Sequence, residues 1–397
     1  MISRQILEDI SNSSTIRSMF IEGKELANEI GEENVYDFSL GNPATPAPIN
    51  FTSALSDIIR EEDSLSLHGY MDNAGYPEVR EAVAQNLNRR FHTDFSKKNI
   101  IMTVGAAGAI NVILKTLIDP GDEMIVFAPY FTEYRNYIGN WRGQLVVTEP
   151  DYQTFQPNFA DFESKIAAKS KVVMINNPVN PTGVVYSKST IRRIATILSQ
   201  KQKEYDHEIY IISDEPYREL IYDRKNIPFI SKYYNNTFMT YSFSKSLSVP
   251  GERIGYLAVP NEMADFEWVM SGLTIANRIC GFINAPSLLQ KAVALCLDET
   301  ADVEFYDRNR KLIYHELTGM GFSCVKPEGA FYMFIKSPVA DEKAFVETAK
   351  QFHIILVNGS TFACPGYVRL AYCCSYEMIQ KSLSAFRKLA QYYHLSA

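Results

Sequence analysis

Residues 241–256 read YSFSKSLSVPGERIGY and place one lysine, Lys245, among small hydroxyl residues. The segment has no helical or strand pattern of apolar residues, so packing does not explain a lysine at this position. Pro250, Gly251 and Arg253 follow shortly after it. An amine at the end of a strand, beside hydroxyl groups and an arginine able to hold a phosphate, is typical of enzymes that form a Schiff base with a cofactor.

Length, charge and cysteine usage limit the classes of function. A chain of 397 residues has room for two domains, because a single core stops growing near about 250–300 residues. A net charge of −7 without a dense basic run argues against nucleic acid and anionic membranes, so small-molecule substrates are expected. The six cysteines form no C-x-x-C pair, and no metal site is expected. With neither a signal peptide nor a membrane span in the sequence, we expect a reducing, cytoplasmic location.

From residue 100 onward, short apolar runs alternate with helical stretches such as 109–117 and 189–202. This alternation predicts β-α-β units, and therefore an α/β fold with a seven-stranded, mostly parallel sheet flanked by helices. Such sheets bind their ligands at the carboxyl ends of the strands. The expected strands cover residues 100–104, 123–127, 144–148, 171–176, 208–213, 237–242 and 254–259.

A second, smaller α/β domain is expected toward the C-terminus. Its predicted elements are helices over 287–297 and 302–318, a strand over 329–337 and a closing helix over 378–393. A further helix is expected over residues 14–30. The expected division is a large cofactor-binding domain, 48–286, and a small domain that combines 1–47 with 287–397.

Residues with chemical potential follow the ends of several expected strands. The turn Gly-Ala-Ala at 105–107 leads into a helix and offers free N–H groups to a phosphate, and Phe131 can stack on a flat ring. The rigid run NNPVNPTG at 176–183 offers amide groups. Asp214 needs a partner such as a protonated pyridine nitrogen, and Tyr217 lies close behind it. Each signal alone also fits an ordinary structural role, so the argument depends on their clustering at one edge of the sheet.

Together these motifs resemble the fold-type I, class I and II aminotransferases, which use pyridoxal 5′-phosphate, over nearly the whole chain from residue 14. The resemblance implies catalytic roles for three residues. Lys245 would carry the cofactor, Asp214 would pair with its ring nitrogen, and Tyr217 would bind its phenolic oxygen. The other implied cofactor-binding residues are Gly105, Ala106, Ala107, Ser242 and Arg253 at the phosphate, Asn180 at the phenolic oxygen, Phe131 on the ring face, and Tyr70 at the phosphate of the neighbouring subunit.

The resemblance also implies a substrate site shared within a homodimer. In the run CPGYVRLAY at 364–372, Arg369 matches the arginine that holds the substrate α-carboxylate in a two-pronged ion pair. Gly41 would add a backbone N–H to that carboxylate, and Asn180 is also expected at the substrate. Arg278 has the spacing of an arginine that some members send across the dimer interface to a distal carboxylate, although a solvated surface arginine fits equally well. Ala107 stands where some bacterial aspartate aminotransferases have a lysine for this carboxylate, so that route is absent.

The expected activity is transfer of an amino group from an L-amino acid to a 2-oxo acid, with 2-oxoglutarate as the expected acceptor, by a ping-pong mechanism. A pyridoxal-phosphate-dependent carbon–sulfur β-lyase, or other α-carbon chemistry on the same fold, remains an alternative because the motifs barely separate these reactions. Residues 242–245 also match the S-x-x-K pattern of serine acylases, but the partner motifs K-T-G and S-D-N are missing. The amino donor is not specified by the sequence.

Overall fold

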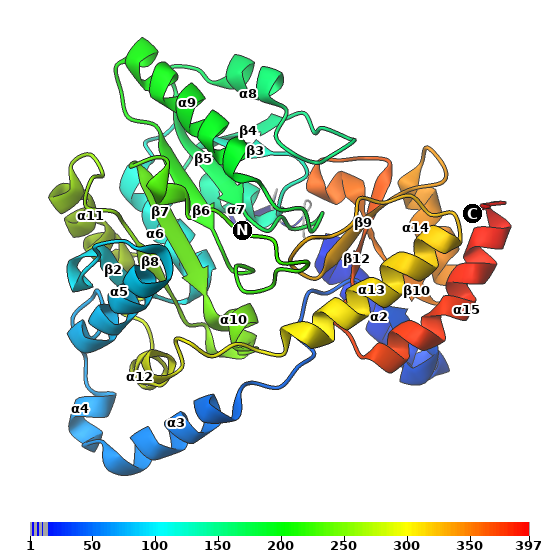
Figure 1. Ribbon diagram of the computed structural model, residues 1–397, viewed down its shortest axis with the longest axis horizontal. Coiled ribbons are helices and arrows are strands. Elements are labelled where there is room, and N and C mark those ends of the chain that lie inside the picture. Colours follow the sequence, from blue (N-terminus) through cyan, green and yellow to red (C-terminus); the bar gives the residue numbers. More distant parts are fainter. Residues whose placement is uncertain (1, 4–5, 8–9, 11–14, 397) are drawn as a thin grey trace.

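The computed structural model describes residues 2–3, 6–7, 10 and 15–396. Its main feature is a large, seven-stranded sheet (Figure 1). The strands are β2 (Ile100–Thr103), β3 (Glu123–Phe127), β4 (Gln144–Thr148), β5 (Ser170–Asn176), β6 (Tyr210–Asp214), β7 (Thr237–Ser242) and β8 (Gly255–Ala258). They are ordered β2-β8-β7-β6-β5-β3-β4, and β8 alone of these seven runs against its neighbours. The expected seven-stranded, mostly parallel sheet is confirmed.

Helices cover both faces of this sheet because both faces are apolar. In β5, Val172 and Met174 belong to one core, and Val173 and Ile175 belong to the core on the opposite face. The large region also contains helices α3 (Ile49–Glu61), α4 (Ser64–His68), α5 (Pro77–Phe91), α6 (Gly105–Leu117), α7 (Glu133–Gly139), α8 (Phe159–Lys165), α9 (Lys188–Tyr205), α10 (Phe243–Ser246), α11 (Phe266–Ile279) and α12 (Ser287–Leu295). Helices α6 and α11 contribute to the first core, and α8 and α9 to the second, so the sheet lies between two helical layers.

The reversed direction of β8 matters for the placement of Arg253. The carboxyl ends of the parallel strands meet at one edge of the sheet, and the amino end of an antiparallel strand reaches the same edge. Arg253 lies just before β8, while Lys245 lies just after β7, and the two strands pair Ser242 with Gly255. The turn between β7 and β8 therefore brings both cations to the edge where the other strands end.

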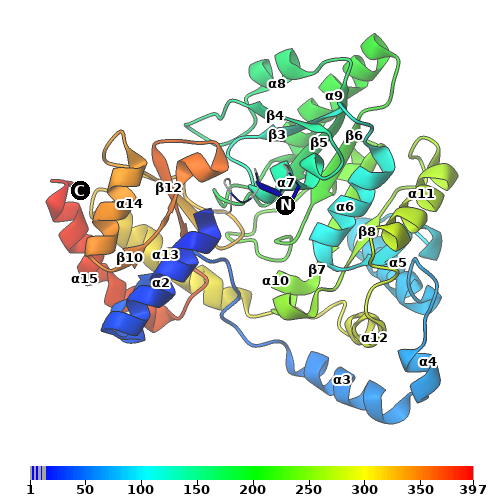
Figure 2. The same ribbon diagram turned by 180° about the vertical axis from the view of Figure 1, so that it is seen from behind.

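A smaller region lies beside the large sheet, with the closing helix α15 (Tyr376–Tyr392) on the side away from that sheet (Figures 1 and 2). It contains an antiparallel sheet ordered β11-β12-β9 and a parallel pair that joins residues 36–37 to 354–355. Its elements are α2 (Thr15–Ile30), β1 (Tyr36–Asp37), α13 (Val303–Gly319), β9 (Tyr332–Lys336), α14 (Glu342–Gln351), β10 (Ile354–Ile355), β11 (Val357–Asn358), β12 (Tyr367–Ala371) and α15 (Tyr376–Tyr392). The N-terminal segment thus packs with the C-terminal part of the chain.

The domain boundaries at residues 48 and 286 stay a prediction. Helix α12 opens the segment 287–397, which was expected to belong to the small domain. Its side chains Leu289, Ala292 and Val293 nevertheless share a core with α3 and α5 of the large region. Across the described ranges, no helix combines the length and the apolar character that crossing a membrane requires.

Local expectations differ from the structure mainly at the ends of elements. The predicted helix over 14–30 is present from Thr15, and residue 14 lies outside the described residues. The predicted strand over 329–337 is shorter, and β9 begins only at residue 332. The reason is that Gly329 and Ala330 donate their N–H groups to the carbonyl oxygens of Gly183 and Leu220, at 2.9 Å each, instead of to a strand.

Gly255 gives a test of how tightly β7, β8 and α6 pack. A Cβ at this position would lie 2.2 Å from the Tyr241 carbonyl oxygen and 3.0 Å from the Gly105 Cα, and both atoms belong to backbone. We expect Gly255→Ala to lower the free energy of unfolding by about 1–3 kcal/mol, measured by urea denaturation. Gly251→Ala is the control, because nothing lies within 4 Å of a Cβ there. Equal unfolding midpoints for the two variants would contradict this packing.

Candidate active site

Lys245 lies in the short helix α10 at the carboxyl edge of the sheet, and its amine is enclosed by the protein. The ammonium donates a hydrogen bond to the carbonyl oxygen of Gly41 at 2.7 Å and lies 5.4 Å from the centre of the Phe331 ring. Burial lowers the pKa of Lys245 to about 8, and the positive charges of Arg253 and Arg369 act in the same direction. About a tenth of the amine is therefore uncharged, and nucleophilic, near neutral pH, which is far more than for an ordinary lysine.

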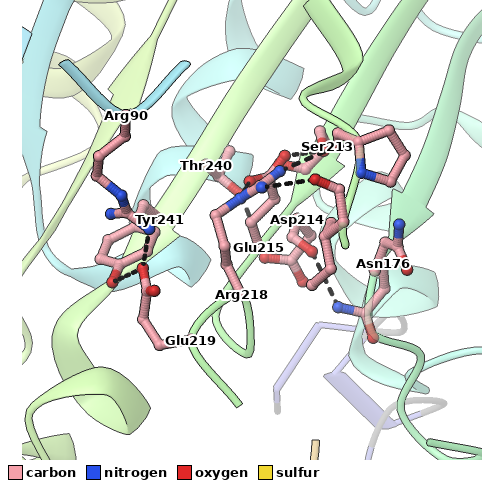
Figure 3. Close-up of polar contacts among 12 residues, drawn as sticks. Arg90, Asn176, Ser213, Asp214, Glu215, Arg218, Glu219, Thr240 and Tyr241 are labelled. Atoms are coloured by element: carbon pink, nitrogen blue, oxygen red, sulfur yellow. Dashed lines mark hydrogen bonds and ion pairs between the residues drawn. The ribbon is translucent and has the colours of Figure 1, made fainter. Parts of the chain in front are cut away.

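Asp214 ends β6 and carries a buried carboxylate. Tyr134 donates a hydrogen bond to it at 2.5 Å and Thr240 donates another at 3.2 Å, while the Asn176 side chain donates to the Asp214 main-chain oxygen at 3.0 Å (Figure 3). Burial raises the pKa of Asp214 to about 6, although the two hydroxyl hydrogen bonds oppose this shift. In the part of the chain that the structure describes, no lysine or arginine pairs with this carboxylate. The Asp214 carboxylate could therefore pair with a cation that comes from a ligand and not from the described residues.

Arg369 in β12 is a buried cation, with only 2% of its surface exposed. Its Nη1 donates to the Asn180 side-chain oxygen at 3.1 Å, and its Nη2 donates to the carbonyl oxygen of Ser39 at 2.6 Å. Its Nε–H has no hydrogen-bond partner among the described residues. Burial lowers the pKa of the guanidinium. A buried arginine with a free donor is suited to a carboxylate ligand.

A group of hydrogen-bond donors gathers where α6 begins. Ser242 caps α10 by accepting a hydrogen bond from the Ser244 N–H at 3.2 Å, and their two hydroxyl groups are 2.8 Å apart. Arg253 donates to the Ser244 hydroxyl at 3.3 Å. Gly105, with a φ of +67°, leaves room for this arginine, because a Cβ there would lie 2.9 Å from Arg253 Nη2. The N–H groups of the first turn of α6, at Ala106 and Ala107, point toward the same edge.

Two pairs of aromatic side chains, Tyr217 with Tyr332 and Phe131 with Tyr134, also belong to the site at this edge of the sheet. The hydroxyl groups of Tyr217 and Tyr332 are 2.9 Å apart, and both side chains are buried. Burial raises the pKa of Tyr217 well above its usual value, so its hydroxyl stays protonated and is available as a donor. Phe131 packs edge-on against Tyr134 at 5.5 Å between ring centres. Phe131 is therefore connected through Tyr134 to the Asp214 carboxylate.

Tyr70 and Arg278 do not join this cluster within the chain. Tyr70 is 93% exposed, and Arg278 is exposed near the end of α11. Hydrogen bonds nevertheless join the two chain segments that carry them. Asn73 donates a hydrogen bond to the Ile283 carbonyl oxygen at 3.0 Å, and the Asn277 side chain donates to the Asn73 carbonyl oxygen at 2.8 Å.

Sequence reasoning did not assign several side chains that hold the site. Ser244 was visible beside Lys245, and Tyr134 in the aromatic run after β3, but neither was given a role. Thr240 and Tyr332 gave no local signal, because their contacts come from neighbouring strands.

Two groups of side chains behind Asp214 fix the segment that follows β6 (Figure 3). Glu215 and Arg218 form a buried ion pair. Next to them, Glu219 pairs with Arg90 and accepts a hydrogen bond from Tyr241.

Comparisons with known proteins agree with this geometry. The family model for aminotransferase class I and II matches residues 33–386. The chain is 31% identical to an aspartate aminotransferase of Thermotoga maritima over 96% of its own length and 97% of that protein. A solved amino transferase structure from Eubacterium rectale has a TM-score of 0.96 and 42% identity, with 99% of each chain covered. The aspartate aminotransferase of Thermus thermophilus solved with maleate has a TM-score of 0.86 and 25% identity, over 98% of this chain and 99% of that one.

The resemblance drawn from the motifs is therefore confirmed at the level of the family. An aminotransferase assignment also accounts for a buried amine, a buried unpaired carboxylate and a buried arginine at one edge of the sheet. The chain belongs to the class I and II aminotransferases, which are enzymes that depend on pyridoxal 5′-phosphate and act on amino acids and keto acids.

Proposed function

We propose that this aminotransferase takes the amino group of an L-amino acid and passes it, in two half-reactions, to a 2-oxo acid, with 2-oxoglutarate as the acceptor. One observation carries the proposal. Lys245 and Arg369 are far apart in the sequence, yet both donate to the same loop, at the carbonyl oxygens of Gly41 and Ser39. A substrate whose α-carboxylate is held by Arg369 would thus present its α-amino group and α-proton toward Lys245.

The donors and acceptors at this edge fit pyridoxal 5′-phosphate. The unpaired Asp214 carboxylate suits a protonated ring nitrogen, and the buried Tyr217 hydroxyl suits the phenolic oxygen. When bound, the cofactor supplies an electron sink for the α-carbon. The other residues proposed to hold it are Asn180 at the phenolic oxygen, Phe131 on the ring face, and Gly105, Ala106, Ala107, Ser242 and Arg253 at the phosphate.

The chain's own residues then move the protons. Lys245 Nζ would take the α-proton of the substrate as a general base and would then give it up as a general acid. Asp214 would favour a protonated ring nitrogen when the cofactor is bound, because its own buried charge would otherwise remain unpaired. Arg369, together with the Gly41 N–H and Asn180, holds the substrate carboxylate in place during the transfer.

We further propose a homodimer in which each subunit completes the other's site. Exposed apolar side chains, which are costly to leave in water, occur in the chain segments on either side of Tyr70 and Arg278. They are Ile49, Ile59 and Leu65 on the side of α3 and α4, and Ile275, Ile279 and Ile283 at the end of α11. Tyr70 would reach the phosphate site of the partner subunit, and Arg278 the distal carboxylate of a substrate bound there.

All six cysteines are free thiols, which supports the expected cytoplasmic location.

The pH dependence of cofactor loading tests the role of Lys245. Its pKa of about 8 is about two units below that of an ordinary lysine. The uncharged amine, which is the attacking form, therefore becomes fully available at a correspondingly lower pH. The rate at which cofactor-free protein gains the visible band with pyridoxal 5′-phosphate should rise with pH and level off above pH 8. Lys245→Ala should give no band and lose turnover, whereas Lys232→Ala, at an exposed lysine, should behave as wild type. A band and undiminished turnover in Lys245→Ala would exclude the proposed mechanism.

Complementation between two damaged subunits tests the shared site. Tyr70→Ala and Lys245→Ala should each lose at least tenfold of the turnover. In a hybrid dimer, one of the two sites regains an intact lysine and an intact tyrosine, so a refolded equimolar mixture should recover about one quarter of wild-type activity. A mixture no more active than the better parent would show that Tyr70 does not act across subunits.

A panel of amino acids tests Arg278 and identifies the donor, with bleaching of the visible band as the measurement. If Arg278 pairs with a distal carboxylate, Arg278→Ala should slow the reaction of aspartate and glutamate by about 10- to 100-fold, and that of apolar amino acids by less than threefold. Arg192→Ala, at an exposed arginine on α9, is the control. Equal rates of aspartate and glutamate in wild type and Arg278→Ala would exclude this role. Release of pyruvate and ammonia without a keto-acid acceptor would instead indicate a lyase.

A further inference from the structure

Tyr332 lies beside Arg369, Tyr217 and Gly41 of the site. Nothing in the sequence indicated a functional role for it. It opens β9, where it lies opposite Ala371 of β12, while Arg369 lies opposite Phe334. Side chains two residues apart on paired strands share one face of a sheet, so Tyr332 and Arg369 are diagonal neighbours. The centre of the Arg369 guanidinium lies 4.7 Å from the centre of the Tyr332 ring. The ring therefore makes a cation–π contact with the Arg369 guanidinium.

The hydroxyl group of Tyr332 faces away from the sheet, toward Tyr217. Their oxygens are 2.9 Å apart, and Tyr217 is the hydrogen-bond partner that the described residues provide for this hydroxyl. The same oxygen lies so close to Gly41 that a Cβ on Gly41 would be 2.0 Å from it. Tyr332 is 3% exposed, so neither its ring nor its hydroxyl is free to leave this position at low cost.

The direction of the hydrogen bond follows from counting protons. A tyrosine hydroxyl has one proton to donate. If Tyr217 donates its proton to the phenolic oxygen of the cofactor, the proton between the two tyrosines must come from Tyr332. Accepting this bond polarises the Tyr217 hydroxyl and makes it a stronger donor.

We propose that Tyr332 is a positioning residue with two roles: its hydroxyl orients and polarises Tyr217, and its ring holds the Arg369 guanidinium for the substrate carboxylate. The inference rests on the proposed function of Tyr217 and Arg369 and adds the group that connects them. The two roles reside in different atoms of one side chain, so different substitutions separate them.

Tyr332→Phe tests the role of the hydroxyl. A weaker donor at Tyr217 leaves more negative charge on the phenolic oxygen, and the neighbouring covalent link to Lys245 then holds its proton to higher pH. The pKa read from the visible band should therefore rise by about half a unit or more, and KM for the best amino acid should change less than twofold. Tyr372→Phe is the matched control, because it removes a buried hydroxyl that donates to the Ala330 carbonyl oxygen at 3.2 Å, in the same core.

The double variant Tyr217→Phe/Tyr332→Phe shows whether Tyr332 acts through Tyr217. If it does, adding Tyr332→Phe to Tyr217→Phe produces no further shift of the band. An additional shift of the same size in the double variant would overturn the hydroxyl role. This measurement also holds if one variant is less stable, provided that its band forms.

Tyr332→Leu tests the role of the ring. Loss of the cation–π contact with Arg369 should raise KM for the best amino acid about tenfold beyond the effect of Tyr332→Phe, while kcat changes less than threefold. Equal KM values for the Phe and Leu variants would overturn the ring role, and a wild-type band pKa in Tyr332→Phe would overturn the hydroxyl role. A wild-type protein that forms no band at all would instead contradict the proposed function, and this inference with it.

Discussion

Two buried cations depend on two carbonyl groups of a single loop. Lys245 and Arg369 have lost most of their contact with water, and the carbonyl oxygens of Gly41 and Ser39 replace part of it. A carbonyl dipole stabilises a positive charge without cancelling it, so both cations remain able to interact with anions. The loop that contains residues 39–41 therefore keeps the site polar inside an apolar core, and the spacing of its carbonyl groups sets the spacing of the two cations.

The architecture of the sheet explains why these groups come together. Parallel strands deliver Asp214 and Asn176 to one edge, and the reversed strand β8 delivers Arg253 to that edge from the opposite direction. The smaller sheet supplies Arg369 and Tyr332 from paired strands. Four of these residues lie in paired strands, and Arg253 lies two residues before one, which suits a site that has to hold a ring, a phosphate and a carboxylate in fixed relation.

Much of this arrangement was predictable from the sequence, because strand periodicity and strand-end residues are local signals. The seven strands, the helix that follows the turn at 105–107 and the placement of Lys245 and Asp214 at strand ends all follow from patterns a few residues long, although α6 begins at residue 105 and not at the expected 109. Thr240 and Tyr332 were not predictable in this way. Thr240 reaches Asp214 from the next strand, and Tyr332 meets Tyr217 across 115 residues, so their roles depend on register and on how two sheets approach one another. The late start of the strand predicted from residue 329 has the same origin, since the N–H groups of Gly329 and Ala330 bond to distant carbonyl groups.

The unpaired charge of Asp214 links the lifetime of the protein to its cofactor supply. A buried carboxylate that the described residues pair with hydroxyl groups and with no cation destabilises the native state, and a cationic ring beside it would remove that penalty. A ligand that binds only the native state shifts the folding equilibrium by mass action. The cofactor-free chain is consequently the form that opens more often, and opened chains are the substrates of proteases. Availability of the vitamin-derived cofactor would then regulate how much of this enzyme a cell retains, as well as how active it is.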